Sequence, residues 1–180
     1  LLSSTFSSAS FLIVWLSQDY LQQLNIPIQA FGWAWAIFHL GMSLASINSH
    51  HLQRLLGIKR AIFLLILILA TSYICLGSIS QVWGLVLILN IYLVRGFCSP
   101  LILKAINQQI ASSVRATILS LNSLVFRVAF ALVAPLVGAI ASRYNLSLGL
   151  IVAGCLFLIS GCLCWWQLVR VRAFNNMLGC

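Results

Sequence analysis

The stretch AIFLLILILATSYICLGSISQVWGLVLILNIYLV, residues 61–94, decides the fold of this chain. It carries no formal charge over its whole length, and such a segment is stable in lipid but not in water. A membrane-spanning helix needs about 20 apolar residues, because the hydrocarbon core is about 30 Å thick and each helical residue rises about 1.5 Å. The stretch is therefore too long for one span. The polar break Gly77–Gln81 divides it into two predicted spans, residues 61–76 and 82–103.

The composition of the whole chain agrees with this interpretation. Of its 180 residues, 62% are hydrophobic and only 6% are charged, and the mean hydropathy is +1.09. A soluble domain carries about 25% charged residues, so a surface this poor in charge would aggregate in water. Surrounded by lipid tails the same surface is stable, because apolar side chains lose nothing by facing hydrocarbon. We therefore expect an all-α, polytopic integral membrane protein.

Polar turns divide the rest of the sequence into four further apolar segments. Together with the two spans above they predict one domain, residues 1–180, with six transmembrane helices over 1–20, 28–49, 61–76, 82–103, 116–141 and 146–168. The chain begins with Leu1 inside an apparent span, without the basic start of a secretory signal. We therefore expect it to be a fragment of a longer membrane protein.

The basic residues are distributed unequally between the two sides of the predicted bundle. The chain has ten Lys and Arg residues against one acid, Asp19, and a net charge of +9. Positive charge marks the cytoplasmic side of membrane proteins, so we expect both chain ends in the cytoplasm and the protein in a plasma (inner) membrane. Because the basic residues serve this orientation, we expect no nucleic-acid partner. One side collects Arg54, Lys59, Arg60, Lys104, Arg115, Arg170 and Arg172, whereas the other has Arg143 and Asp19.

The predicted spans differ in how polar groups are placed along them. Small and polar residues recur at three- and four-residue intervals along residues 116–141, which places them on one helical face. The first span carries serines in a similar pattern, and the second carries His39, Ser43 and Ser46 on one face. Residues 61–76 and 146–168 are apolar nearly all round, as lipid-facing helices are. We expect the first, second, fourth and fifth spans to have an interior-facing side, and the third and sixth to be peripheral.

Three segments give the chain a resemblance to a known family. The loop QRLLGIKR, residues 53–60, resembles a degenerate copy of the Gly-rich basic motif between helices eight and nine of major facilitator superfamily transporters, without the acid that often precedes the glycine. Arg95 and Gly96 with Pro100 resemble the Arg-Gly…Pro feature of helix ten in many members. RATILSL, residues 115–121, continuing to Arg127 and to PLVG at residues 135–138, is similar to the start of helix eleven in a drug-efflux-like branch.

The resemblance implies that the chain is the C-terminal six-helix half of such a transporter, helices seven to twelve. It implies a missing N-terminal half as partner, a lipid bilayer around both halves, and a small-molecule substrate. In the family layout, the first and fourth helices of this half line the cavity, the second and fifth pack against the other half, and the third and sixth face lipid. The activity that it implies is secondary active transport by alternating access, in the form of efflux or antiport.

Arg95 and Arg127 are the strongest candidates for a functional site. A charge near the bilayer centre costs about 2.5–3.5 kcal/mol on insertion scales, so each guanidinium needs water, a partner or a substrate. At about 1.5 Å per residue, Arg95 lies about 13 Å and Arg127 about 17 Å from the cytoplasmic ends of their predicted spans. Asp19 is expected at the opposite surface. Three interpretations remain: a structural or gating contact, an acid in the missing half, and an anionic substrate.

Further candidates share the spans with these arginines. Tyr92 and Ser99 lie on the Arg95 side of the fourth span, where they line either a substrate site or a water-filled seam. His39 is either a proton relay, because imidazole titrates near neutrality, or a helix–helix hydrogen-bond partner. The predicted helix kinks are at Gly96, Pro100, Pro135 and Gly138, and the predicted cytoplasmic gating motif consists of Arg54, Gly57, Lys59, Arg60 and Arg115.

Catalytic and cofactor motifs are scarce in this sequence. A single acid excludes a paired-carboxylate mechanism, and neither a P-loop nor a dinucleotide-binding fingerprint is present. Three histidines, two of them adjacent, do not form a metal site by themselves. We therefore expect no enzyme activity and no cofactor. The alternatives to a transporter are a non-transporting six-helix scaffold or a membrane-enzyme subunit. A channel is a third alternative, and it is disfavoured because the sequence has no segment that resembles an ion-selectivity filter.

The charge distribution makes a prediction about topology. Epitope tags inserted after Arg54 and after Arg143 should be accessible from opposite sides of the membrane, because basic loops stay in the cytoplasm. Antibody labelling of intact and of permeabilised cells measures this accessibility. Two tags that are accessible from the same side would contradict the predicted topology.

Overall fold

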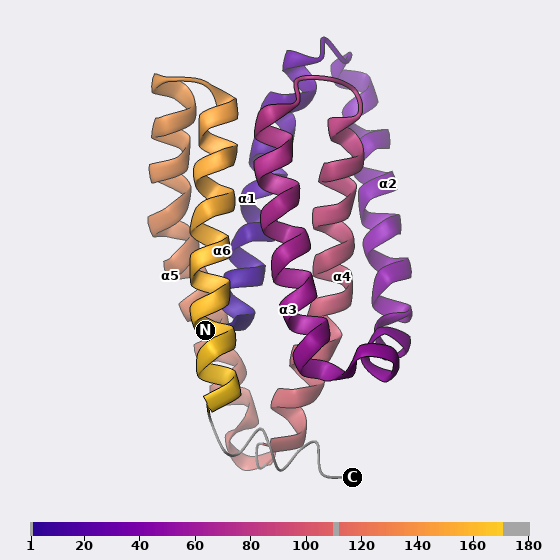
Figure 1. Ribbon diagram of the computed structural model, residues 1–180, viewed down its shortest axis with the longest axis vertical. Coiled ribbons are helices and arrows are strands. Elements are labelled where there is room, and N and C mark those ends of the chain that lie inside the picture. The colour runs from indigo at the N-terminus through magenta and orange to yellow at the C-terminus, as the bar shows by residue number, and fades with distance from the viewer. Residues whose placement is uncertain (1, 110–111, 171–180) are drawn as a thin grey trace.

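The computed structural model describes residues 2–109 and 112–170, and over these residues it forms six α-helices without a β-strand. The helices run side by side as one bundle (Figure 1), which confirms the all-α membrane architecture. Helix lengths of 20 to 32 residues are those of membrane-spanning segments. Their bounds are α1 Leu2–Gln23, α2 Ile28–Ile47, α3 Ser49–Ser78, α4 Gly84–Gln109, α5 Ser112–Arg143 and α6 Leu146–Arg170.

Five of the six helices, α2 to α6, are long and apolar enough to cross a membrane. The exception is α1, whose 22 residues have sufficient length but include a series of serines. It packs against α2, α4, α5 and α6, so protein rather than lipid surrounds much of it. Ser10 donates to the Phe6 carbonyl at 2.7 Å and Ser17 to the Val14 carbonyl at 3.0 Å. The least apolar helix thus lies inside the bundle, where its hydroxyls cost least.

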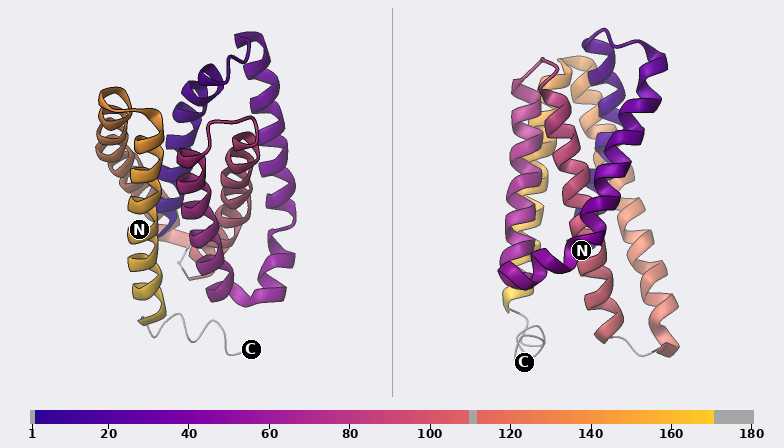
Figure 2. Two further views of the ribbon diagram at one scale, coloured as in Figure 1. Left: turned by 45° about the horizontal axis from the view of Figure 1, so that its top comes forward. Right: turned by 90° about the vertical axis from the view of Figure 1, so that its right-hand side faces the viewer.

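Burial within the bundle does not follow the polarity of the helices. The span of α3 is apolar nearly all round, yet among the five apolar spans it is the most buried, with 56% of its residues inside, against 6% for α5 and 11% for α2. Figures 1 and 2 show α3 and α6 together on one face, with α2 and α5 toward the other. Within these six helices α3 is therefore not the peripheral helix that we expected. His39 of α2 and Arg127 of α5 are exposed on the outside of the unit.

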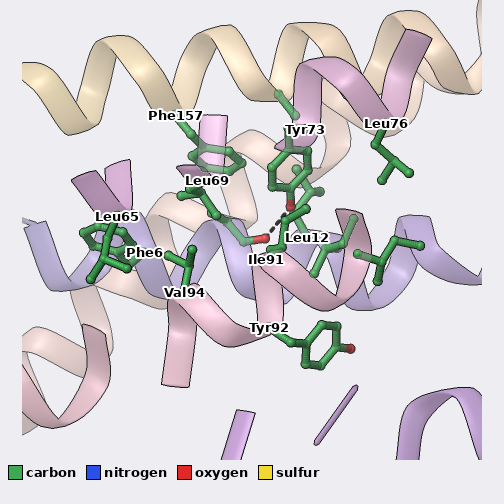
Figure 3. Packing of buried hydrophobic residues seen from close by; sticks show 14 of the residues in the cluster. Phe6, Leu12, Leu65, Leu69, Tyr73, Leu76, Ile91, Tyr92, Val94 and Phe157 are labelled. Carbon is green, nitrogen blue, oxygen red and sulfur yellow. Dashed lines mark hydrogen bonds between the residues drawn. The ribbon is translucent and has the colours of Figure 1, made fainter. Parts of the chain in front are cut away.

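The core is a cluster of buried aliphatic and aromatic residues between α1, α3, α4 and α6. Figure 3 shows Tyr73 among them, with its hydroxyl donating to the Ala9 carbonyl of α1 at 2.5 Å. The Tyr73 ring also lies against Phe157 of α6, with 5.5 Å between the ring centroids. At one end of the bundle the Tyr20 hydroxyl contacts the carbonyl oxygens of Ile79 and Gln81, at 2.5 and 2.9 Å. Tyrosines thus tie α1 to α3 and to the connection before α4.

The two ends of the bundle differ in charge. The start of α3, the end of α4, the start of α5 and the end of α6 gather at the lower end in Figure 1. These segments carry six of the seven basic residues that we placed on one side of the membrane, and the seventh, Arg172, lies outside the described residues. Arg143 ends α5 at the opposite end. That the basic end faces the cytoplasm stays a prediction.

A sharp bend at Gly57 divides α3 into a short helical segment and the long span (Figure 2). The expected loop from His50 to Arg60 is therefore helical on both sides of this glycine. Gly57 has φ 70° and ψ 156°, a backbone conformation that is essentially restricted to glycine. The backbone thus requires the glycine of the basic motif, because Gly57 turns the chain from the short helical segment of α3 into its long span.

Three glycines predict different effects of the same substitution. Gly57→Ala strains the backbone at positive φ and should destabilise by about 1–3 kcal/mol. Gly96→Ala places a Cβ against the Met42 carbonyl and against Ala45 Cβ of α2, and overpacking of this kind also costs about 1–3 kcal/mol. The Cβ of Gly138→Ala meets open space on a regular helix, so this substitution should raise the stability of the folded protein by up to about 1 kcal/mol.

Thermal unfolding of the purified chain in detergent, followed by tryptophan fluorescence, measures these differences. The melting temperature should fall for the first two variants and hold or rise for Gly138→Ala. Equal melting temperatures for all three variants would contradict the described backbone at Gly57 and the close approach at Gly96.

Candidate functional site

A pocket of about 390 Å³ lies between α2 and α4. It forms where the two helices come closest, because Gly96 leaves no side chain between the α4 backbone and the Met42 carbonyl of α2. One wall carries apolar side chains, whereas the remaining lining is polar and includes a guanidinium and three hydroxyl groups. The side chains that line it are Met42, Ser43, Ser46 and Ile47 of α2 and Arg95 and Ser99 of α4.

Arg95 is the only charged residue that lines this pocket. Its side chain is half-buried, and its Cζ lies 5.6 Å from the ring centroid of Phe11 on α1, a cation–π contact. The only acid of the chain, Asp19, lines two other pockets, between α1 and α5 near the opposite end of the bundle. The described contact of the Arg95 guanidinium is therefore with an aromatic ring, and not with the one carboxylate side chain of this protein.

Tyr92 and His39 lie together in the same α2–α4 seam. The Tyr92 ring stacks on Phe38 with centroids 5.3 Å apart and meets the His39 ring at 5.2 Å in an edge-to-face arrangement. Figure 3 shows Tyr92 pointing away from the other labelled core residues. Its hydroxyl is buried without a hydrogen-bond partner among the described residues. His39 is exposed, and its Nδ1 lies 2.9 Å from the Trp35 carbonyl. Four of the five predicted cavity residues thus gather along one helix pair.

Arg127 lies apart from this group. It belongs to α5, which packs on α1 and α6, while Arg95 belongs to α4, which packs on α2, α3 and α1. The two helices follow each other in sequence, but α1 lies between them (Figure 1). The Arg127 side chain is exposed on the outer face of the unit. The two arginines therefore do not share a pocket, although the sequence places them at similar depths.

An aromatic cluster that sequence analysis missed connects the Arg95 site to α5. The Phe11 ring lies 5.1 Å from that of Phe126 and 5.7 Å from that of Phe130, measured between centroids. Phe11 thus contacts Arg95 on one side and α5 on the other. No sequence signal singles out these rings, because phenylalanine is common throughout apolar spans.

The residues of the predicted gating motif and kinks are distributed over three helices. Arg54, Lys59 and Arg60 flank the bend at Gly57, and the Lys59 carbonyl accepts a hydrogen bond from Trp165 Nε1 at 3.2 Å. Arg115 is half-buried near the start of α5. α4 continues through Gly96 and Pro100, and α5 continues through Pro135 and Gly138. Their roles in gating and kinking stay predictions.

Among the described residues no group of three His, Cys, Asp or Glu side chains is placed to hold a metal ion. The arrangement that the structure does provide is a polar, cationic pocket that extends from Arg95 to Ile47, the last residue of α2. A charged group at this position is expensive in a membrane and is typical of solute or ion pathways.

The comparisons with known proteins identify the family of the chain. A search of the curated proteins and a search of the solved structures each found no match. The model of the Major Facilitator Superfamily matches residues 1–176, nearly the whole sequence. The chain therefore belongs to the major facilitator superfamily.

Proposed function

We propose that this chain forms one half of a secondary active transporter, which moves a small solute across the membrane by alternating access. Membrane transport is the general function of the superfamily. The alternatives of a scaffold or an enzyme subunit lack a comparable observation in their favour. The resemblance of residues 115–138 to a drug-efflux-like branch favours efflux as the direction of transport. The charge distribution favours an orientation with both chain ends in the cytoplasm, and we place the protein in the plasma membrane.

The observation that carries this proposal is the pocket around Arg95. In membrane transporters, substrate and coupling-ion sites lie near the bilayer midplane, between helices of the bundle. Arg95 lies about 16 Å along α4 from its first residue, Gly84, at 1.5 Å per residue, and the pocket is built from two facing helices. A half-buried cation with hydroxyl groups beside it offers hydrogen-bond donors to a solute at that depth. We assign solute binding to Arg95 and Ser99, with Tyr92 and His39 beside them in the seam.

The exposed faces of α2 and α5 support a second six-helix half as partner. Both helices expose a polar group in mid-span, His39 on α2 and Arg127 on α5, and lipid does not solvate such groups. Both also expose apolar side chains at the three- and four-residue spacing of helix-packing seams. On α2 these are Trp33, Ile37, Leu40, Leu44 and Ile47, and on α5 they are Leu121, Leu124, Val128, Leu132 and Leu136.

Gradient-driven flux tests the transport activity. The complete protein, with both halves, in proteoliposomes should move a solute when a proton or sodium gradient is imposed. Arg95→Gln should lower the transport rate by about tenfold or more, because it removes a charge-assisted contact worth about 1.5–3 kcal/mol. Arg143→Gln, the same charge change at an exposed turn, should transport as the unmodified protein does. Absence of flux for a broad panel of solutes under both gradients would contradict the proposed activity.

Co-purification of separately expressed halves tests the partner. Ala131 is exposed on α5 and Cys155 is exposed on α6. A tryptophan at either position is accepted by lipid, but a packed helix interface does not accept one. Ala131→Trp should therefore abolish co-purification with the upstream half, whereas Cys155→Trp should retain it. Unchanged co-purification of Ala131→Trp would place α5 against lipid instead.

A further inference from the structure

We infer that the solute is a small organic monoanion, whose carboxylate binds the Arg95 guanidinium in the α2–α4 pocket. This inference rests on the proposed transport function and names the substrate class of the same site. The pocket also has apolar side chains in Met42 and Ile47, which suit the hydrocarbon part of such a solute.

The uncompensated charge of Arg95 favours an anion at this position. Arg95 stays protonated under all physiological conditions, and Asp19, the only acid of the chain, lines pockets on the other side of α1. The cation–π contact with Phe11 offsets part of the cost of placing the charge in the membrane but does not neutralise it. One guanidinium balances one negative charge, so a monoanion fits the site and a dianion leaves a charge uncompensated.

Hydrogen-bond donors beside the guanidinium match a carboxylate. The Ser43 hydroxyl donates to the His39 carbonyl at 2.9 Å and is therefore engaged within its own helix. Ser46 and Ser99 also line the pocket, and the described contacts include no hydrogen bond for either hydroxyl. Their protons are available to a bound oxygen atom, while the guanidinium presents the forked N–H groups that bind carboxylates in pairs. Phe11, on the far side, restricts how the guanidinium can turn.

The depth of the Arg95 guanidinium within the bundle favours a solute over a lipid headgroup as the source of the anion. Arg95 lies about 13 Å from the cytoplasmic end of its predicted span, whereas lipid phosphates lie outside the hydrocarbon core. An acid from the second half of the transporter is the remaining competitor. It makes a different prediction in the absence of solute, because removing one member of a buried ion pair destabilises a protein, while removing an unpaired buried charge does not.

Benzoate and benzamide provide a matched pair of probes. They share a ring and nearly the same shape, but only benzoate is an anion. Thermal unfolding of the complete, purified transporter is followed in a zwitterionic detergent with each compound, for the unmodified protein and for Arg95→Gln, Ser99→Ala and Arg143→Gln. A repeat with added phosphatidylglycerol tests whether an anionic lipid occupies the site.

We expect benzoate, but not benzamide, to raise the melting temperature in a saturable way. Arg95→Gln should abolish this shift, Ser99→Ala should weaken the apparent affinity by about tenfold, and Arg143→Gln should leave it unchanged. Without solute, Arg95→Gln should melt at the same or a higher temperature. Equal shifts with benzoate and benzamide would overturn the inference, and so would a benzoate shift that persists in Arg95→Gln. Competition of phosphatidylglycerol with benzoate would also overturn it. A lower melting temperature of Arg95→Gln in the absence of solute would do the same.

Flux measurements separate the failure of this inference from the failure of transport itself. If the protein transports only cations or neutral solutes, and Arg95→Gln leaves their transport rate unchanged, the transport proposal holds and the proposed anion site is wrong. If benzoate stabilises the protein through Arg95 but no solute moves under either gradient, the proposed anion site holds and the transport proposal is wrong.

Discussion

Hydrocarbon offers no hydrogen-bond partner to a polar group, and the arrangement of the six helices follows from this constraint. Helices satisfy the backbone internally, and hydroxyl side chains within them bond to carbonyls one turn earlier. Thr71 donates to the Leu67 carbonyl at 2.8 Å and Ser160 to the Leu156 carbonyl at 2.7 Å. Groups that cannot be satisfied within their own helix must find a partner across the bundle, as the Tyr73 hydroxyl does at the Ala9 carbonyl. Polar contacts of this kind therefore fix α1 against α3 inside the bundle.

The same constraint explains why the serine-rich α1 lies among four neighbours while apolar helices cover one face of the bundle. α1 contributes hydroxyls to contacts with α5, where Ser8 donates to the Phe126 carbonyl at 3.4 Å and Asn122 donates to Ser3 at 3.3 Å. Such contacts replace the hydrophobic effect, which does not drive association between helices in lipid. Helix polarity thus indicates contact with protein or water, but it does not indicate which protein unit provides that contact. His39 on α2 and Arg127 on α5 are exposed within the six described helices.

The sequence predicted the helical membrane architecture because long apolar runs and the turns between them are local signals. The sequence did not predict which helices pack together, since helix pairing depends on distant residues that meet only in the bundle. Arg95 was recognisable as a charge in an apolar run, and the spacing of Ser43 and Ser46 marked the facing helix. The role of Phe11 was not recognisable, because the ring becomes significant only when α1 and α4 are adjacent. The separation of Arg95 from Arg127 has the same origin, because α4 and α5 follow each other in sequence but do not pack closely in the bundle.

The Arg95 pocket lies between α4 and a helix, α2, that packs mainly on this one neighbour. α3 and α6 pack against each other along most of their length, and α1 is surrounded, whereas α2 depends mainly on α4 for its contacts within the unit. The backbone approach at Gly96 holds these two helices together beside the pocket. A solute bound between Arg95 and the α2 serines would bridge the same two helices, so its binding energy would favour one arrangement of α2 relative to α4. Coupling of solute binding to helix movement then requires only the helix pair that forms the site.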